Sequence, residues 1–155
     1  MTNSVRYQFT QQFAVPAKKA FQWCTDYEPG DHLLMGEKNA KRKVTHLTDA
    51  TIILTDIFET SSGNVEKQKL VQLYPEKLAW ISTHLAGPNK YSQFIYEISA
   101  KGENASSIQF TGLHLEYEKA NLSKGDANSF ANKLCKEDSE AWKLLAKAMK
   151  KELCT

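Results

Sequence analysis

Residues 123–153 read SKGDANSFANKLCKEDSEAWKLLAKAMKKEL, and this stretch decides the fold. Apolar side chains recur along it at the three- and four-residue spacing of one helix face, namely at Ala127, Phe130, Ala131, Leu134, Ala141, Trp142, Leu145, Ala148 and Met149. Charged residues occupy many of the other positions, so the pattern predicts one long amphipathic helix. Ser123, with Asp126 three residues later, predicts its N-terminal cap. Such a terminal helix needs a partner for its apolar face, and a curved sheet is the simplest one.

The residues before this helix predict that sheet. Alternating apolar and polar side chains, divided by turn signals, indicate strands at 4–13, 41–47, 51–60, 65–74, 78–85, 91–100 and 107–118. Proline is favoured at the start of a helix, so a short helix is expected from Pro16 to Thr25, with at most another turn or two through His32 and Leu34. Short turns make an antiparallel meander the simplest topology. A sheet that curls round a helix leaves room for a binding pocket.

The composition indicates one globular domain, residues 1–155. The chain has 41% hydrophobic and 25% charged residues and a net charge of +2, which gives no reason to expect nucleic acid. No apolar run is long enough to cross a bilayer, so no stable membrane insertion is expected. Three cysteines at unrelated spacings, without a signal-peptide core, predict reduced thiols in a cytoplasmic protein: Cys24, Cys135 and Cys154.

The basic residues cluster once, at Lys38, Lys41, Arg42 and Lys43. One interpretation is a solvated strand or loop. The other is a patch that meets an anionic lipid headgroup or a protein partner.

Two segments carry a resemblance to a known family. Residues 13–23 read FAVPAKKAFQW, a strand that runs into a proline-started helix bearing an aromatic, and residues 73–80 read LYPEKLAW, a strand–proline–strand corner. With the order of elements, these segments resemble the START-like, polyketide-cyclase-like (SRPBCC) superfamily. The resemblance implies an α+β helix-grip fold: a curved antiparallel sheet of about seven strands around the C-terminal helix, with two short helices after the first strand.

The resemblance also implies a hydrophobic cavity between the sheet and the terminal helix. Members of the superfamily bind lipids, sterols, quinones, hormones or polyketides. Some catalyse cyclisation or dehydration in the cavity, and others act as co-chaperones. The superfamily has no shared catalytic motif to carry over, so the catalytic residues stay unknown.

Asp138 is the anomaly of the terminal helix, because it lies near the centre of the apolar face. A buried carboxylate is costly unless it is paired, and desolvation raises its pKa. Asp138 is therefore a candidate polar contact to a ligand. The alternatives are a structural pair with a tyrosine, histidine, lysine or arginine of the sheet, and a helix rotated far enough for Asp138 to reach water.

His84 and His114 lie on strands that are expected to be neighbours. If both point inward they face the same cavity as Asp138, and the three groups then form a candidate acid–base set. The alternative is that each histidine is exposed or satisfied structurally. A β-bulge at Gly112 would reconcile the two apolar faces of the last strand and decide where His114 points.

Aromatic and aliphatic side chains are the expected walls of the cavity. The candidates are Trp80, Phe94, Tyr96, Phe110, Phe130, Leu134 and Trp142. Each is either core or cavity lining, and the hydroxyl of Tyr96 would offer a specificity contact in a cavity.

The sequence supports three functional hypotheses. The first is binding of a small hydrophobic ligand, such as a lipid, polyketide or quinone, without a metal or organic cofactor. The histidines and cysteines show no metal-ligand spacing. The second is a cofactor-independent cyclase or dehydratase that uses the same cavity. The third is a co-chaperone-like interaction protein whose cavity is filled by side chains.

Overall fold

The computed structural model describes residues 3–119 and 121–154. The chain begins with strand β1 (Asn3–Phe13) and two short helices, α1 (Ala17–Thr25) and α2 (Asp31–Leu34). Six strands follow: β2 (Ala40–Thr48), β3 (Thr51–Thr60), β4 (Gly63–Tyr74), β5 (Ala79–Ala86), β6 (Gln93–Ala100) and β7 (Ser106–Glu116). A 3-10 turn, Pro75–Lys77, separates β4 from β5, and helix α3 (Lys124–Leu153) is the last element.

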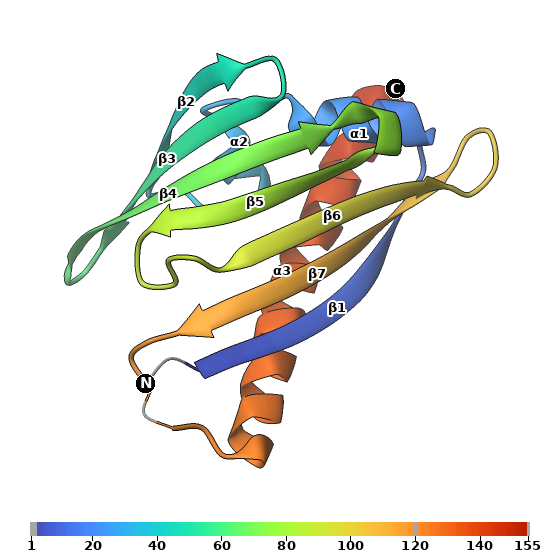
Figure 1. Ribbon diagram of the computed structural model, residues 1–155. Helices are drawn as coiled ribbons and strands as arrows, with labels where there is room; N and C mark the ends of the chain where they lie inside the picture. Colours follow the sequence, from blue (N-terminus) through green and yellow to red (C-terminus); the bar gives the residue numbers. More distant parts are fainter. Residues whose placement is uncertain (1–2, 120, 155) are drawn as a thin grey trace.

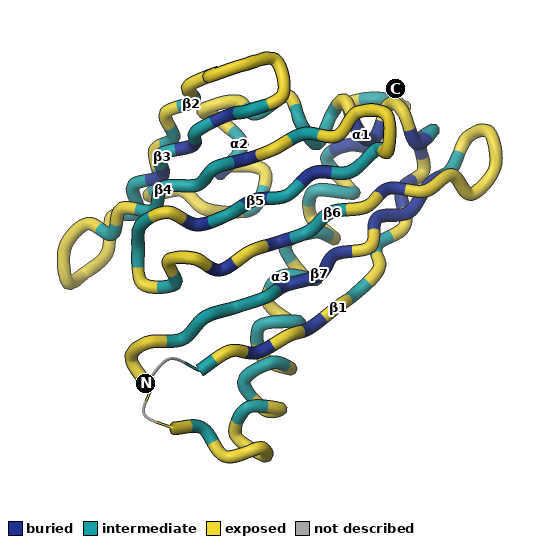
Figure 2. Tube along the Cα trace, viewed as in Figure 1, coloured by how far each residue is buried: buried dark blue, intermediate teal, exposed yellow. Residues whose placement is uncertain are grey.

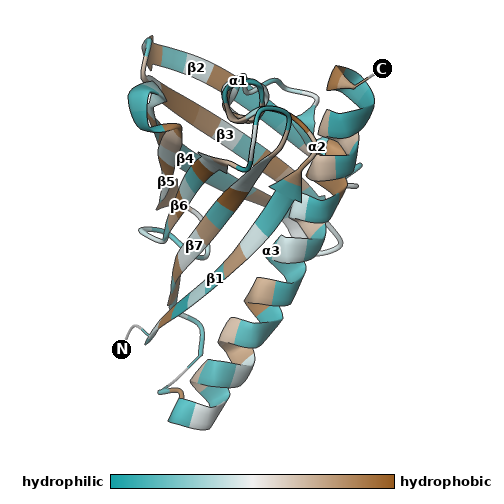
Figure 3. Ribbon diagram, turned by 90° about the vertical axis from the view of Figure 1, so that its right-hand side faces the viewer, coloured by the Kyte–Doolittle hydropathy of each residue, from teal (hydrophilic) through white to brown (hydrophobic). Residues whose placement is uncertain are grey.

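The seven strands form one antiparallel sheet in the order β1-β7-β6-β5-β4-β3-β2 (Figure 1). The sheet curves, and α3 crosses its hollow side with its closest packing along β1 (Figure 3). Ser123 caps α3 as predicted, since its Oγ accepts a hydrogen bond from the backbone N–H of Asp126. The helix-grip fold expected from the sequence is thus confirmed.

Several predicted strand boundaries differ from the structure by one or two residues, and two of these differences have a backbone reason. Leu78 has a φ of 50° and ends the 3-10 turn, so β5 begins one residue later, at Ala79. Tyr91 has a φ of 69°, which is incompatible with an extended strand, so β6 begins at Gln93.

Gly112 does not form the bulge that the sequence suggested. The β7 register runs without a break through Gly112, which pairs with Tyr7 on one side and Phe94 on the other. A Cβ atom on Gly112 would lie 2.5 Å from the Tyr7 ring, so the glycine makes room for that ring. With no bulge, His114 shares the inner face of β7 with Phe110.

The core lies towards the α1 end of the sheet. Strand β1, helix α1 and the central strands supply most of its buried side chains, which Figure 2 marks in dark blue. In α3, all of whose residues are described, only Met149 is buried. The rest of the inner face of α3 is half-buried or more exposed, so helix and sheet do not pack solidly together. Among the described residues, no helix is long and apolar enough to cross a membrane.

Replacing Gly112 by alanine should destabilise the protein by about 1–3 kcal/mol, because the added methyl group overpacks the Tyr7 ring. Chemical denaturation measures the loss. Gly125→Ala is the matched control, since the nearest atom to its added Cβ lies 4.0 Å away and the position is helical. Equal stability of Gly112→Ala and wild type would show that Tyr7 does not need the space.

Candidate functional site

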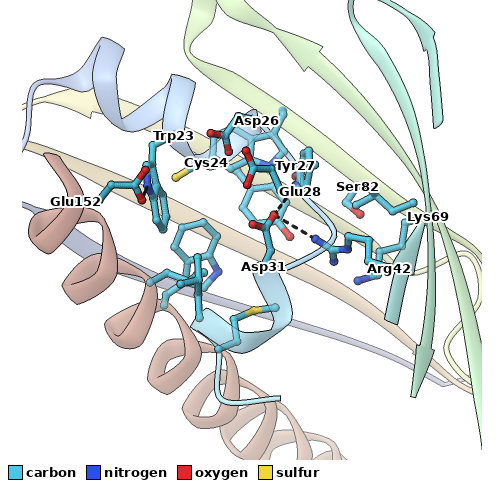
Figure 4. Close-up of a pocket in the computed structure, with 17 residues that line it drawn as sticks. Trp23, Cys24, Asp26, Tyr27, Glu28, Asp31, Arg42, Lys69, Ser82 and Glu152 are labelled. Carbon is cyan, nitrogen blue, oxygen red and sulfur yellow. Dashed lines mark hydrogen bonds and ion pairs between the residues drawn. The ribbon is translucent and has the colours of Figure 1, made fainter. Parts of the chain in front are cut away.

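A pocket of about 210 Å³ lies between the sheet and the C-terminal part of α3. The pocket is lined by side chains from α1, the α1–α2 segment, α2 and the residue after it, five neighbouring strands (β2 to β6) and the C-terminal half of α3 (Figure 4). The pocket therefore sits where the half-buried helix leaves space above the curved sheet.

Aromatic rings form much of the pocket wall. All three tryptophans of the chain line it: Trp23 from α1, Trp80 from β5 and Trp142 from α3. Tyr96 of β6 stacks on Trp80 with 4.7 Å between ring centroids, and its ring lies 5.7 Å from that of Trp142. These flat apolar surfaces are suited to contact with another ring.

A cluster of buried charged side chains lies on the side of the pocket that faces the tryptophans. Asp56 of β3 is fully buried and receives hydrogen bonds from Arg42, at 2.7 Å from Nε and 3.0 Å from Nη2. Lys69 Nζ lies 3.0 Å from the same carboxylate, and His32 Nε2 lies 3.2 Å from it. Burial alone would raise the pKa of Asp56, but these partners hold it well below its ordinary range.

This Asp56 cluster holds α2 in place at the edge of the pocket. His32 belongs to α2 and is buried against β3. The guanidinium of Arg42 also lies over the Tyr27 ring, 5.8 Å from its centroid, and 3.6 Å from a carboxylate oxygen of Asp31. Arg42 and Lys69 both line the pocket, so the cluster forms a polar wall that faces the tryptophans.

Four carboxylates surround the outer part of the pocket. This acidic rim consists of Asp26, Glu28, Asp31 and Glu152, and Figure 4 shows Asp26, Glu28 and Asp31 together, with Glu152 beside Trp23. Partial burial, followed by repulsion from the other three acids, raises the pKa of Asp26 to about 6. Among the described residues, no ion pair involves Asp26, Glu28 or Glu152.

Solved structures share this fold. An aromatase/cyclase from a Streptomyces species matches with a TM-score of 0.77 at 9% identity, over 97% of this chain and 96% of that one. A Thermus thermophilus protein matches at 0.70 and 14%, over 97% and 99%. A START superfamily protein from Mycobacterium smegmatis matches at 0.68 and 13%, over 93% and 98%. The chain has the START-like, polyketide-cyclase-like fold. No family model and no curated protein sequence matches it.

Three of the predicted ligand contacts line the pocket, namely Trp80, Tyr96 and Trp142. The others lie outside the pocket lining: Asp138, His84, His114, Phe94, Phe110, Phe130 and Leu134. Phe94 and Phe110 belong to a second apolar cluster, against which Leu134 packs. Phe130 lines a shallow depression near the start of α3.

Asp138 is paired with a tyrosine of the sheet. The Tyr7 hydroxyl donates a hydrogen bond to Asp138 Oδ2, which joins β1 to α3. Burial raises the pKa of Asp138, and the hydrogen bond from Tyr7 opposes that rise. The same burial and the charge of Asp138 raise the pKa of Tyr7 far above its ordinary value, so Tyr7 stays a donor at every physiological pH.

His84 and His114 both lie on the inner face of the sheet, but their strands, β5 and β7, are not neighbours as expected, because β6 lies between them. Each histidine has a side-chain partner of its own. His84 Nδ1 lies 2.9 Å from Asn89 Oδ1, and burial lowers the pKa of His84 to about 4. His114 Nε2 lies 3.6 Å from a Glu116 carboxylate oxygen, and its ring meets Phe130 edge to face. Burial lowers the pKa of His114 as well.

The Asp56 cluster and the acidic rim are the parts of the site that sequence reasoning missed. A signal for Asp56 was present, because it shares its face of β3 with buried Ile52 and Leu54. The rim acids carry no comparable signal, since they come from a loop, a four-residue helix and a helix end. Among the described residues, no group of three or more histidine, cysteine or acidic side chains is arranged to hold a metal ion.

Asp56→Asn should lower the free energy of unfolding by about 3 kcal/mol or more, because it leaves Arg42 and Lys69 buried without their anion. Lys69→Met keeps the two hydrogen bonds from Arg42 to Asp56 and should cost less than about 1 kcal/mol. Urea denaturation of both variants measures the difference.

The stability of wild type and of Asp56→Asn should depend differently on pH. The folded-state pKa of Asp56 is depressed, so its stabilising effect is present above the unfolded value of about 3.9 and is lost as the pH falls below it. Wild type should lose stability steeply below pH 4, and Asp56→Asn less so. Parallel acid-denaturation curves would contradict a stabilising role for the Asp56 carboxylate.

Tyr7→Phe should cost about 1–2 kcal/mol at pH 8, because it leaves the Asp138 carboxylate without its donor. The pKa of Asp138 is already raised in the folded protein, so this cost should shrink as the pH falls and the carboxyl becomes protonated. Asp138→Asn keeps an acceptor for Tyr7 and is the control. Thermal unfolding at pH 4 and pH 8 gives the comparison, and a cost that does not vary with pH would contradict the assignment.

Proposed function

We propose that the protein binds a small, ring-containing hydrophobic ligand in the pocket between the sheet and α3. The observation that carries the proposal is the convergence of all three tryptophans on one pocket of about 210 Å³. Aromatic walls with a few convergent polar groups are the usual composition of small-molecule sites.

The size of the pocket narrows the ligand class. An engineered apolar cavity of about 150 Å³ holds one benzene molecule, whereas pockets for drug-sized ligands are typically about 300–1,000 Å³. A pocket of about 210 Å³ therefore suits a single ring with a short side chain. Of the ligand types expected from the sequence, a simple quinone or another one-ring compound fits best, and long-chain lipids and multi-ring polyketides fit poorly.

The polar wall of the pocket is rigid before a ligand enters, which favours specific ligand binding. Arg42 is held by two hydrogen bonds to Asp56 and by the Tyr27 ring. A wall fixed in this way is pre-organised, so little side-chain entropy is lost when a ligand enters.

A second candidate function is acid–base catalysis in the same pocket. The observation in its favour is that Asp26, with a pKa near 6, lines the pocket together with Lys69 and Tyr27. A carboxyl group that titrates near neutral pH is suited to proton transfer. One solved structure of this fold is an aromatase/cyclase. The open pocket counts against the third hypothesis, an interaction protein with a filled interior.

Tryptophan emission provides the test, because every tryptophan of the chain lines the pocket. Titration with neutral one-ring probes, 2-phenylethanol and benzyl alcohol, should shift the emission and raise the melting temperature. Leu145→Phe adds volume to the pocket wall and should weaken binding by about tenfold, equal to about 1.4 kcal/mol.

Leu144→Phe is the matched control. Leu144 is the preceding residue, is 44% exposed and does not line the pocket, so its substitution should leave binding unchanged. Equal weakening by both substitutions, or no response of wild type to either probe, would count against the proposed site.

A further inference from the structure

We propose that the ligand carries a positively charged amine as well as a ring, and that the acidic rim (Asp26, Glu28, Asp31 and Glu152) holds the ammonium group. This inference rests on the proposed function, since it assigns the ligand class of the same pocket. It predicts that an amine binds more tightly than a neutral ligand of equal size. The proposed function, which requires only a ring, makes no such prediction.

The first support is the charge balance of the pocket lining. Four carboxylates and two cationic side chains, Arg42 and Lys69, line the pocket. Both cations are already bound to Asp56, a further carboxylate behind the wall. Asp31 also lies near Arg42, but among the described residues the other three rim acids form no ion pair. An incoming cation would supply the charge that the rim lacks.

The second support comes from the backbone. Helix α1 ends at Thr25 and α3 ends at Leu153, so Asp26 and Glu152 stand at the carboxyl ends of two helices. These ends carry partial negative charge and carbonyl groups without helical partners, both of which favour a cation. Lys150 and Lys151 belong to the last turn of α3 but do not line the pocket.

The third support is the set of rings beside the rim. Trp23 Nε1 donates a hydrogen bond of 2.8 Å to Glu152, which holds an indole ring next to a carboxylate at the pocket edge (Figure 4). Trp142 lines the same pocket from α3. An ammonium group gains from contact with an aromatic face and from a nearby carboxylate together.

An unpaired donor in the pocket wall is independent evidence that a ligand completes the site. Trp80 is 1% exposed, and its Nε1 has no hydrogen-bond partner among the described residues. The side chain of Tyr27 makes a weak hydrogen-bonding interaction with Trp80, which opposes the rise of the Tyr27 pKa on burial, but its geometry does not satisfy the Nε1 donor. A ligand acceptor near this N–H would remove the cost of burying it unpaired.

The inference also predicts a pH dependence. The groups around Asp26 are Glu28 and Asp31 of the α1–α2 segment, Glu152 of α3, and the sheet cations Arg42 and Lys69. Because the pKa of Asp26 is raised to about 6, protonation below that pH removes negative charge from the rim. Affinity for an ammonium ligand should therefore fall as the pH decreases through 6, and affinity for a neutral ligand should not.

Three probes of matched size test the inference by tryptophan emission: 2-phenylethylamine, 2-phenylethanol and 3-phenylpropionate. At pH 7.5 and low salt, the amine should bind about tenfold more tightly than the alcohol, and the carboxylate should bind most weakly. Between pH 7.5 and pH 5 the advantage of the amine over the alcohol should shrink, because Asp26 loses its charge over this range.

A pair of double variants separates the rim from net charge. Asp26→Asn with Glu28→Gln should sharply reduce the preference for the amine, measured as the ratio of its affinity to that of the alcohol in the same variant. Asp49→Asn with Glu118→Gln removes the same charge from exposed positions outside the pocket lining and should change neither affinity. Equal loss in both double variants would overturn the inference.

The remaining outcomes are also decisive. Binding of the alcohol with no preference for the amine would overturn the inference and leave the proposed function standing. No binding of any of the three probes would overturn both.

Discussion

The burial of Asp56 is the constraint on which the site depends. A fully buried carboxylate must be satisfied, and here its partners come from three other elements: Arg42 from β2, Lys69 from β4 and His32 from α2. One side chain thus fixes the edge of the sheet, the polar wall of the pocket and the position of a helix too short to be stable alone. Three of the four acids of the rim, Asp26, Glu28 and Asp31, belong to that helix and the segment before it.

The aromatic wall of the pocket depends on how loosely α3 packs on the sheet. Helix α3 reaches from the Tyr7–Asp138 contact at β1 to the pocket, where it supplies Trp142. Within α3, whose residues are all described, Met149 alone is buried, so much of its apolar face is left without tight packing. That incomplete packing leaves room for a ligand. The stacked rings of Trp80 and Tyr96 give the pocket a defined shape.

Periodicity predicted the elements well because it reflects burial on one face, which local sequence encodes. The strand ends at Leu78 and Tyr91 were missed because positive φ values are imposed by turn geometry. Asp138 was recognised as anomalous, but the sequence left its partner open, since the Tyr7 contact joins residues at opposite ends of the chain. The rim acids were not predicted because the fold gathers them from separate elements without a shared period.

In the described part of the chain, strand β1 pairs only with β7, which lies far from it in the sequence. Its residues pair with β7, from Asn3 with Glu116 to Phe13 with Ser106, and the Tyr7 hydroxyl reaches α3 later still. A nascent chain emerging from the ribosome therefore carries β1 without its pairing partner until β7 has been synthesised. Such high contact order slows folding and exposes a strand edge meanwhile. In β1, polar residues alternate with apolar ones. Arg6, Gln8 and Thr10 therefore keep one face of the strand hydrophilic until β7 is available for pairing.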